Sequence, residues 1–381
     1  MTQSSKLALV LVFLLMIFAE GVLQAVLEIR GGERPLIAEL FTQTPSRSNL
    51  RAFEKELEGS SFLSQTCQPV MRFLQFAALN DAGDKALPGR GGWFFYKPGA
   101  RYLIEPWPPR DGVKPGAMDP VFAIVDFRDQ LAALGIHLLV VPAPGKASVY
   151  PEQLTRRAED DPAQVSAHTK KVMGALQAAG VEFVDLFTLF QQAKNSGAEM
   201  YLKQDTHWST AGMRAAAQQT ARRLLELNWI DRGSTDYQLQ AVELTRYGDV
   251  LRMINLPFVN RFYQPERLEC AQVIEASSGR PRSNHPGADI LVLGDSFLRI
   301  YELDEPGSAG FVSHLAYELK TLVDCIINDG GASTLVRQEL ARKPQLLRHK
   351  KVIVYEFVER DIRFGMEGWR RVSLKTDQAS G

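Results

Sequence analysis

The chain has 381 residues, of which 45% are apolar and 23% carry charge. This length suits one large domain or two modest ones, and the apolar fraction is high enough to fill a core. Basic and acidic residues balance at 44 each, and no basic run occurs. The charge balance therefore gives no electrostatic reason to expect a nucleic-acid partner, and a neutral polysaccharide or a small ester fits at least as well.

The amino end departs most clearly from the composition of a soluble protein. Residues 7–19 are apolar without a break, and a weaker apolar pattern continues to about residue 29. A cleaved export signal has an apolar region of about 7–15 residues, whereas a membrane span needs about 20. We expect residues 1–30 to form an uncleaved membrane anchor with the rest of the chain outside the cytoplasm. A cleaved signal and an amphipathic first helix are the alternatives.

The remaining chain divides into a helical lead-in at residues 31–88, a catalytic region at 89–365 and a tail at 366–381. Within the catalytic region, prolines and glycines predict a loop at 106–120, and residues 232–288 form an insertion without a clear period. Strands are predicted at residues 93–96, 136–141, 181–186, 290–293, 322–327 and 352–357, and helices at 121–134, 163–179, 209–227, 310–319 and 333–341.

Helices that alternate with apolar strands indicate an α/β fold, in which a parallel sheet carries helices on both faces. In such sheets the ligand crevice lies outside the carboxyl ends of the strands. Residues that directly follow a strand are therefore the first candidates for a functional site.

The stretch Ile-Leu-Val-Leu-Gly-Asp-Ser-Phe at residues 290–297 predicts a buried strand that ends in a turn presenting Ser296. A serine needs a base within hydrogen-bond reach, and the base needs an orienting group. In Gln-Asp-Thr-His-Trp-Ser-Thr at 204–210, Asp205 and His207 are two residues apart and so point the same way in an extended segment. We predict Ser296 as nucleophile, His207 as base and Asp205 as its orienting carboxylate.

Five other histidines compete for the role of base, but none has a carboxylate two residues before it. They are His137, His168, His285, His314 and His349. Asp295 is expected to bond the backbone amides of its own turn.

Four motifs together resemble the AlgX/AlgJ group of SGNH-hydrolase-like O-acetyltransferases, which act in bacterial exopolysaccharide export. They are the Gly-Asp-Ser-Phe turn, the upstream Asp-Thr-His-Trp-Ser box, Gly-Gly-Trp-Phe-Phe-Tyr at 91–96 and Val-Pro-Ala-Pro-Gly-Lys followed by Tyr-Pro-Glu at 141–152. The resemblance covers about residues 90–360. It implies an SGNH-hydrolase-like, flavodoxin-like sheet in a periplasmic protein tethered to the inner membrane.

The resemblance also implies acetyl transfer to an exported, alginate-type polysaccharide, with a membrane-bound O-acyltransferase as the source of acetyl and other export proteins as partners. An esterase that uses the same residues, and an inactive polysaccharide-binding scaffold, are the two alternatives. The intact motifs argue against the scaffold.

Oxyanion donors are predicted at the Ser296 N–H and, because SGNH enzymes use a glycine N–H and an asparagine side chain, at Asn328 and Gly331. A tight turn is the alternative role for the last two. Trp208 is a packing residue or a sugar platform. Arg299 and Tyr301, just after the serine, are candidates to line the acceptor groove.

No metal-ligand set is visible, and no cofactor is expected. The cysteines Cys67, Cys270 and Cys325 lie far apart in the sequence. They allow one disulfide at most and leave at least one thiol.

Overall fold

The computed structural model describes residues 3–39, 42, 44, 46–105, 119–158, 165–255 and 259–374. Most of the loop predicted at 106–120 and the end of the tail predicted at 366–381 lie outside the described residues. The chain divides into two compact units. The first comprises Met1–Asp81 with Asn255–Val259, and the second comprises Ala82–Ile254 with Asn260–Gly381.

The first unit is helical, whereas the last residues of the lead-in predicted at 31–88 belong to the second unit and form a strand at Ala86–Pro88. Its helices are α1 (Gln3–Arg30), α2 (Leu36–Glu39), α3 (Arg47–Ser60) and α4 (Phe62–Leu79). Gln24 ties α1 to the junction of α3 and α4, because its side chain donates to Ser60 O at 3.3 Å and accepts from Phe62 N at 2.8 Å. Helix α1 forms where an anchor is predicted, but no helix in the described part of the chain combines the length and apolar character needed to cross a membrane.

The second unit is built on a five-stranded sheet in which every pairing is parallel. The strand order is β4 (Glu182–Phe183), β3 (His137–Ala143), β10 (Val352–Val358), β8 (Ile290–Gly294) and β9 (Val323–Ile327). These are the five strands that the apolar runs predict, so the parallel α/β architecture is confirmed. Strand β8 is buried at all five positions, which is why its sequence is uninterrupted by polar residues.

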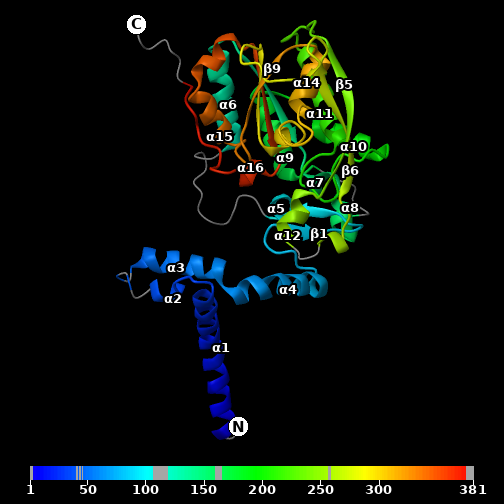
Figure 1. The fold of residues 1–381 in the computed structure, drawn as a ribbon. Coiled ribbons are helices and arrows are strands. Elements are labelled where there is room, and N and C mark those ends of the chain that lie inside the picture. The colour runs from blue at the N-terminus through cyan, green and yellow to red at the C-terminus, as the bar shows by residue number, and fades with distance from the viewer. Residues whose placement is uncertain are drawn as a thin grey trace. The chain divides into compact units, whose positions relative to one another are not determined.

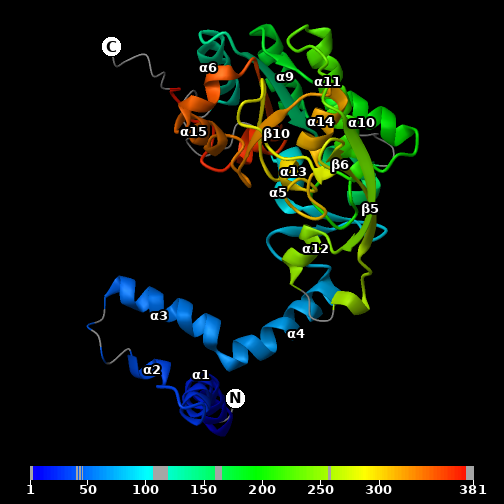
Figure 2. The same ribbon diagram turned by 45° about the horizontal axis from the view of Figure 1, so that its top comes forward.

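Helices cover both faces of this sheet (Figures 1 and 2). One face packs on α6 (Pro120–Ala132), α9 (Ala167–Ala178) and α15 (Leu335–Ala341), and the other packs on α10 (Leu186–Asn195), α11 (Thr210–Glu226) and α14 (Phe311–Leu319). Successive side chains of β10 alternate between the two cores: Val354 belongs to one and Tyr355 to the other. The predicted helices are therefore present.

Short elements cluster near the carboxyl ends of the strands or connect the longer ones. They are β1 (Ala86–Pro88), β2 (Phe94–Tyr96), α5 (Lys97–Ile104), α7 (Lys146–Val149), α8 (Pro151–Leu154), α13 (Ser296–Arg299), α16 (Asp361–Phe364) and the 3₁₀ turns Arg156–Ala158, Val259–Arg261 and Pro344–His349. Cys67, Cys270 and Cys325 are free thiols.

The region predicted as an aperiodic insertion at 232–288 is instead largely an antiparallel sheet. It contains β5 (Tyr237–Arg246), α12 (Asp249–Ile254), β6 (Glu266–Glu275) and β7 (Arg280–Pro281). Strand β6 buries Leu268, Cys270 and Val273, whereas β5 is buried only at Tyr237. Because one strand of the pair lacks a buried face, its sequence shows no clean alternation, and the strand signal is weak.

Candidate active site

The turn after β8 presents Ser296 at the start of α13. The Asp295 side chain accepts a hydrogen bond from Phe297 N at 2.9 Å and so caps this short helix, which confirms the structural role predicted for it. Gly294 allows a close approach, because a Cβ atom there would lie 2.4 Å from Glu356 Oε2. The turn is thus held from below by buried side chains, and the serine hydroxyl faces outward from it.

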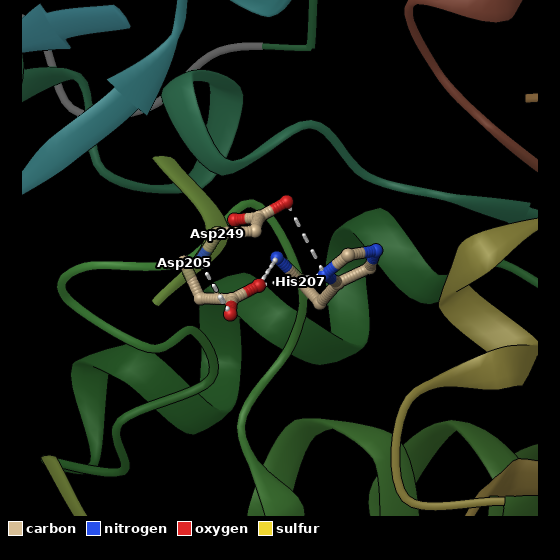
Figure 3. A group of neighbouring side chains, drawn as sticks. All are labelled: Asp205, His207 and Asp249. Atoms are coloured by element: carbon tan, nitrogen blue, oxygen red, sulfur yellow. Dashed lines mark hydrogen bonds and ion pairs between the residues drawn. The ribbon is translucent and has the colours of Figure 1, made fainter. Parts of the chain in front are cut away.

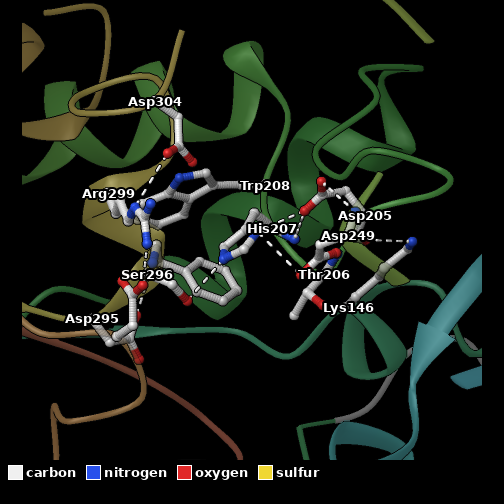
Figure 4. A network of polar contacts seen from close by, with 12 residues as sticks. Lys146, Asp205, Thr206, His207, Trp208, Asp249, Asp295, Ser296, Arg299 and Asp304 are labelled. Carbon is white, nitrogen blue, oxygen red and sulfur yellow. Dashed lines mark hydrogen bonds and ion pairs between the residues drawn. The ribbon is translucent and has the colours of Figure 1, made fainter. Parts of the chain in front are cut away.

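The second half of the site is the segment 204–208, which precedes α11. His207 Nε2 lies 2.9 Å from Ser296 Oγ, and His207 Nδ1 lies 2.6 Å from Asp205 Oδ1 (Figure 4). The Phe297 ring packs edge-on against the imidazole, with ring centroids 5.0 Å apart. The structure therefore brings together the three residues that were predicted from two distant stretches of sequence.

Asp205 is fully buried, yet the groups around it favour the charged carboxylate. Its Oδ1 also accepts from His207 N at 3.1 Å, and its Oδ2 accepts from Asp249 N at 3.0 Å and lies 3.5 Å from Arg246. Burial alone would raise the pKa of Asp205, but His207 and Arg246 outweigh it and hold this pKa well below its usual range. Both carboxylate oxygens are therefore occupied as acceptors.

The imidazole is more basic than an ordinary histidine. Burial alone would lower the pKa of His207, but the charge and hydrogen bond of Asp205, helped by Asp249, raise this pKa. Asp249 Oδ2 lies 3.8 Å from His207 Nδ1, and its Oδ1 accepts from Thr206 N at 2.6 Å (Figure 3). Burial and the neighbouring Asp205 raise the pKa of Asp249 itself.

In the described residues, Asp205, His207 and Asp249 are the one set whose ligand atoms all lie within 4.8 Å, as a metal ion would require. Hydrogen bonds hold these side chains. His207 Nδ1 is engaged by Asp205, and Asp249 is engaged by Thr206 N. The hydrogen bonds therefore match a histidine that is oriented for proton transfer.

Lys146 anchors the base segment from beneath. Its Nζ donates to the carbonyls of Phe94 at 2.6 Å, Lys203 at 2.8 Å and Asp205 at 2.9 Å. The amine also lies 5.0 Å from the centroid of the Trp93 ring. Burial lowers the pKa of Lys146 to about 7, and three carbonyl acceptors match the three protons of its ammonium form.

Ser296 and His207 open into a cavity of about 770 Å³. Its walls come from the end of β5, α12, the turn after β8, the loop after β9 and the end of β10. The charged residues along it are Arg246, Asp249, Arg252, Arg299, Asp304, Glu305, Asp329 and Arg360. The cavity is large enough for a sugar unit of a longer chain, and its volume falls in the range of ligand pockets.

The structure gives Trp208 the packing role, which was one of its two predicted roles, and corrects the prediction that Tyr301 lines the acceptor groove. Trp208 and Tyr301 are 0% exposed and lie in the core, where the Trp208 ring contacts Phe297 and Phe311. Tyr301 donates to Trp208 O at 3.3 Å, away from the cavity. Arg299 does line the cavity, where it pairs with Asp304 at 3.2 Å and with Asp329 (Figure 4).

The predicted oxyanion donors also need correction. Neither Asn328 nor Gly331 lines the cavity, because the Asn328 amide is turned toward Gly331, where an added Cβ would lie 2.3 Å from its Oδ1. Gly330, whose φ is +66°, lines the cavity instead. The Ser296 N–H has no hydrogen-bond acceptor within the described ranges, so it is available to a bound oxyanion as predicted.

Over residues 86–359 the sequence matches the family described as the SGNH hydrolase-like domain of acetyltransferase AlgX. The chain belongs to this family. A relative named probable alginate O-acetylase AlgJ, from Pseudomonas aeruginosa, is 27% identical over 254 residues, which make up 64% of this chain and 60% of the relative. The match thus spans less than two thirds of that relative.

Two solved structures share the fold. The O-acetyltransferase domain of Pseudomonas putida AlgJ aligns with a TM-score of 0.56 and 22% identity, over 77% of this chain and 96% of that structure. Pseudomonas aeruginosa AlgX aligns with a TM-score of 0.53 and 17% identity, over 72% of this chain and 61% of that structure. At these identities the likeness concerns the fold.

Four residues of the site were not singled out from the sequence. Lys146 lies in the motif at 141–146 but was given no role, and Asp249 and Arg246 lie in the region without a clear period. Arg360 follows the last predicted strand by a few residues. Its position at the carboxyl end of a central strand was the one signal that could have identified it.

Proposed function

We propose that this chain transfers acetyl groups to the hydroxyls of a polysaccharide through an acetyl ester formed on Ser296. The observation that supports this most directly is the continuous hydrogen-bonded series from Ser296 Oγ to His207 to Asp205, at 2.9 and 2.6 Å, facing a cavity of about 770 Å³. A serine in this arrangement becomes nucleophilic because the imidazole can remove its proton.

In the first half-reaction, Ser296 Oγ attacks the carbonyl carbon of an acetyl donor while His207 Nε2 takes the hydroxyl proton. The tetrahedral oxyanion then collapses, and the departing oxygen takes that proton from the imidazolium. Asp205 remains ionised throughout, and it keeps the Nδ1 proton directed at itself and Nε2 directed at the serine.

In the second half-reaction, a sugar hydroxyl takes the place of the serine hydroxyl. His207 removes the sugar proton, the sugar oxygen attacks the acetyl ester, and Ser296 leaves with the proton returned to it. Water in place of the sugar would make the same site an esterase. The cavity would hold a sugar in either case, as acceptor of a transferase or as substrate of an esterase, so the products of the reaction distinguish the two.

The acceptor class follows from the names of the relatives, which are called probable alginate O-acetylases. An exported polysaccharide as acceptor, a membrane-bound O-acyltransferase as the source of acetyl, contact with other export proteins and a periplasmic location tethered to the inner membrane all belong to this proposal. They remain predictions from the family resemblance.

The test is incubation of the purified chain with a small acetyl ester, with and without oligosaccharides, followed by mass spectrometry of the products. We expect acetylated oligosaccharide from the wild type and a loss of about 10³ or more in rate for Ser296→Ala. Ser277→Ala, at an exposed position, is the matched control. Free acetate alone would indicate an esterase, neither product would indicate a scaffold, and full turnover by Ser296→Ala would exclude this nucleophile.

A further inference from the structure

Arg360 is a half-buried cation that lines the cavity of the nucleophile, and the triad chemistry does not use it. It follows β10, the strand that pairs directly with β8, and its side chain is 14% exposed. Its guanidinium lies over two rings, 5.2 Å from the centroid of Tyr96 and 5.8 Å from that of Phe297. It lines the same cavity as Ser296 and His207.

The guanidinium has unused hydrogen-bond donors. It carries five N–H groups, and a charged side chain this deeply placed is normally paired. Among the described residues its one ion pair is with Asp361, at 3.8 Å from Nε, and its charge also acts on the buried carboxyls of Asp295 and Glu356. No hydrogen bond from Arg360 to another described residue occurs. Since its nitrogens border the cavity, the missing acceptor is one that arrives with the substrate.

The Phe297 ring connects Arg360 to the residues of the triad. The Phe297 ring on which Arg360 lies follows Ser296 directly in the chain and also packs on the His207 ring, with centroids 5.0 Å apart. Arg252 and Arg299, by contrast, are exposed or paired with acids on the cavity wall. Arg246, which also lines the cavity, is paired with Asp205. Arg360 is thus the little-exposed arginine of the cavity whose guanidinium makes no hydrogen bond to a described residue.

The site also needs a donor. Asn328 and Gly331 do not line the cavity, and the backbone N–H groups of Ser296 and Gly330, which do border it, are neutral donors that bring no charge to balance the developing negative oxygen. A charged donor in a site screened from water stabilises such an oxygen far more than it would in bulk solvent.

We propose that Arg360 donates to the acetyl oxyanion, together with the Ser296 N–H, in both half-reactions. When Ser296 Oγ bonds to the carbonyl carbon, the π electron pair moves onto the carbonyl oxygen, and that oxygen is held by the guanidinium. When the leaving oxygen departs with the proton from His207, the pair returns and the charge on this oxygen is lost. This role rests on the proposed acyl transfer.

Arg360→Gln and Arg360→Lys test it with 4-nitrophenyl acetate, which carries no sugar or carboxylate. We expect Arg360→Gln to lower kcat by about 10²–10³ with little change in KM, and Arg360→Lys to recover part of the loss, since a lysine is charged but less well shaped. Arg222→Gln, an exposed change on α11, is the control. Thermal unfolding of each variant shows whether it is folded. Arg360→Lys keeps the charge at this position and is the variant expected to keep the fold, so a loss of rate in a folded variant reports the loss of the donor.

A second measurement reports on the charge itself. Methylboronic acid adds to an active serine as a tetrahedral anion, so its affinity should fall in Arg360→Gln by about the same factor as kcat/KM. A purely structural change would not produce this match. Two results would overturn the role of Arg360 as an oxyanion donor while leaving the acyl transfer intact. The first is a kcat/KM for Arg360→Gln within about threefold of wild type, and the second is a raised KM with unchanged kcat and boronate affinity. A wild type without Ser296-dependent turnover would overturn both.

Discussion

Replacing Asp205 by asparagine is the sharpest test of the triad geometry, because every neighbour of this carboxylate is a donor. Oδ1 accepts from the Nδ1–H and the backbone N–H of His207, and Oδ2 accepts from Asp249 N–H and faces Arg246. An asparagine must turn its NH₂ group toward one of these two sets. If it faces His207, Nδ1 becomes an acceptor, the proton moves to Nε2, and the imidazole no longer removes the serine proton.

The magnitude follows from the same geometry. At an effective dielectric constant of about 20, unit charges separated by the 2.6 Å between Nδ1 and Oδ1 interact by about 6 kcal/mol, which is an upper limit on the support that Asp205 gives the imidazolium. At about 1.4 kcal/mol per tenfold, this corresponds to a fall of about 10⁴ in kcat. A loss of up to about that size is expected for Asp205→Asn.

The assay is hydrolysis of 4-nitrophenyl acetate, with Asp289→Asn as the matched control. Asp289 immediately precedes β8, at the end of the strand away from Ser296, and pairs with Lys351 on the surface. Circular dichroism of both variants verifies that the fold is retained. If Asp205→Asn kept about a tenth or more of the wild-type kcat, Asp205 would not be the group that orients His207.

Two further predictions concern the base and its anchor. Burial alone would lower the pKa of His207, but Asp205 and Asp249 outweigh it and raise this pKa above the ordinary 6.5. Since the base must be a neutral imidazole, kcat/KM should rise with pH through a midpoint above 6.5, and Asp249→Asn should lower that midpoint. An unshifted midpoint would exclude Asp249 as a contributor. Lys146→Met leaves the buried carbonyls of Phe94 and Asp205 without this donor, whereas Lys203 O keeps its hydrogen bond from Phe94 N. At about 1–3 kcal/mol for each lost partner, urea unfolding should show a loss of at least about 2 kcal/mol, with exposed Lys171→Met near wild type. A loss below about 1 kcal/mol would contradict the anchoring role.

The sequence was informative where a single physical demand dominates. A central parallel strand must be apolar on both faces, so β8 and β10 stand out as apolar runs. A serine that follows such a strand, and an acid two residues before a histidine, are equally local signals. The helix predicted from residue 209 is present as α11, and Ser209 caps it by accepting a hydrogen bond from Gly212 N.

Other features depend on which way a side chain turns, and that is set by distant packing. Trp208 and Tyr301 flank the site in sequence, yet both rings turn inward because α14 provides an apolar surface that covers them. Asp249 reaches His207 because Gly248 packs against the backbone of Gln204, where a Cβ would lie 2.1 Å from a carbonyl carbon. Neither outcome has a local sequence signal.

The imidazole and its carboxylate belong to one stretch of five residues, and the hydroxyl belongs to another element. A displacement of that stretch would therefore carry both groups along together and leave their mutual bond unbroken. Only the spacing across to the serine would widen, and misplacements of about 1 Å can cost about 10²-fold in rate. Lys146 Nζ joins this stretch to strand β2 through the carbonyls of Asp205 and Phe94. It thereby helps to set the distance between His207 and Ser296, although it contacts neither side chain.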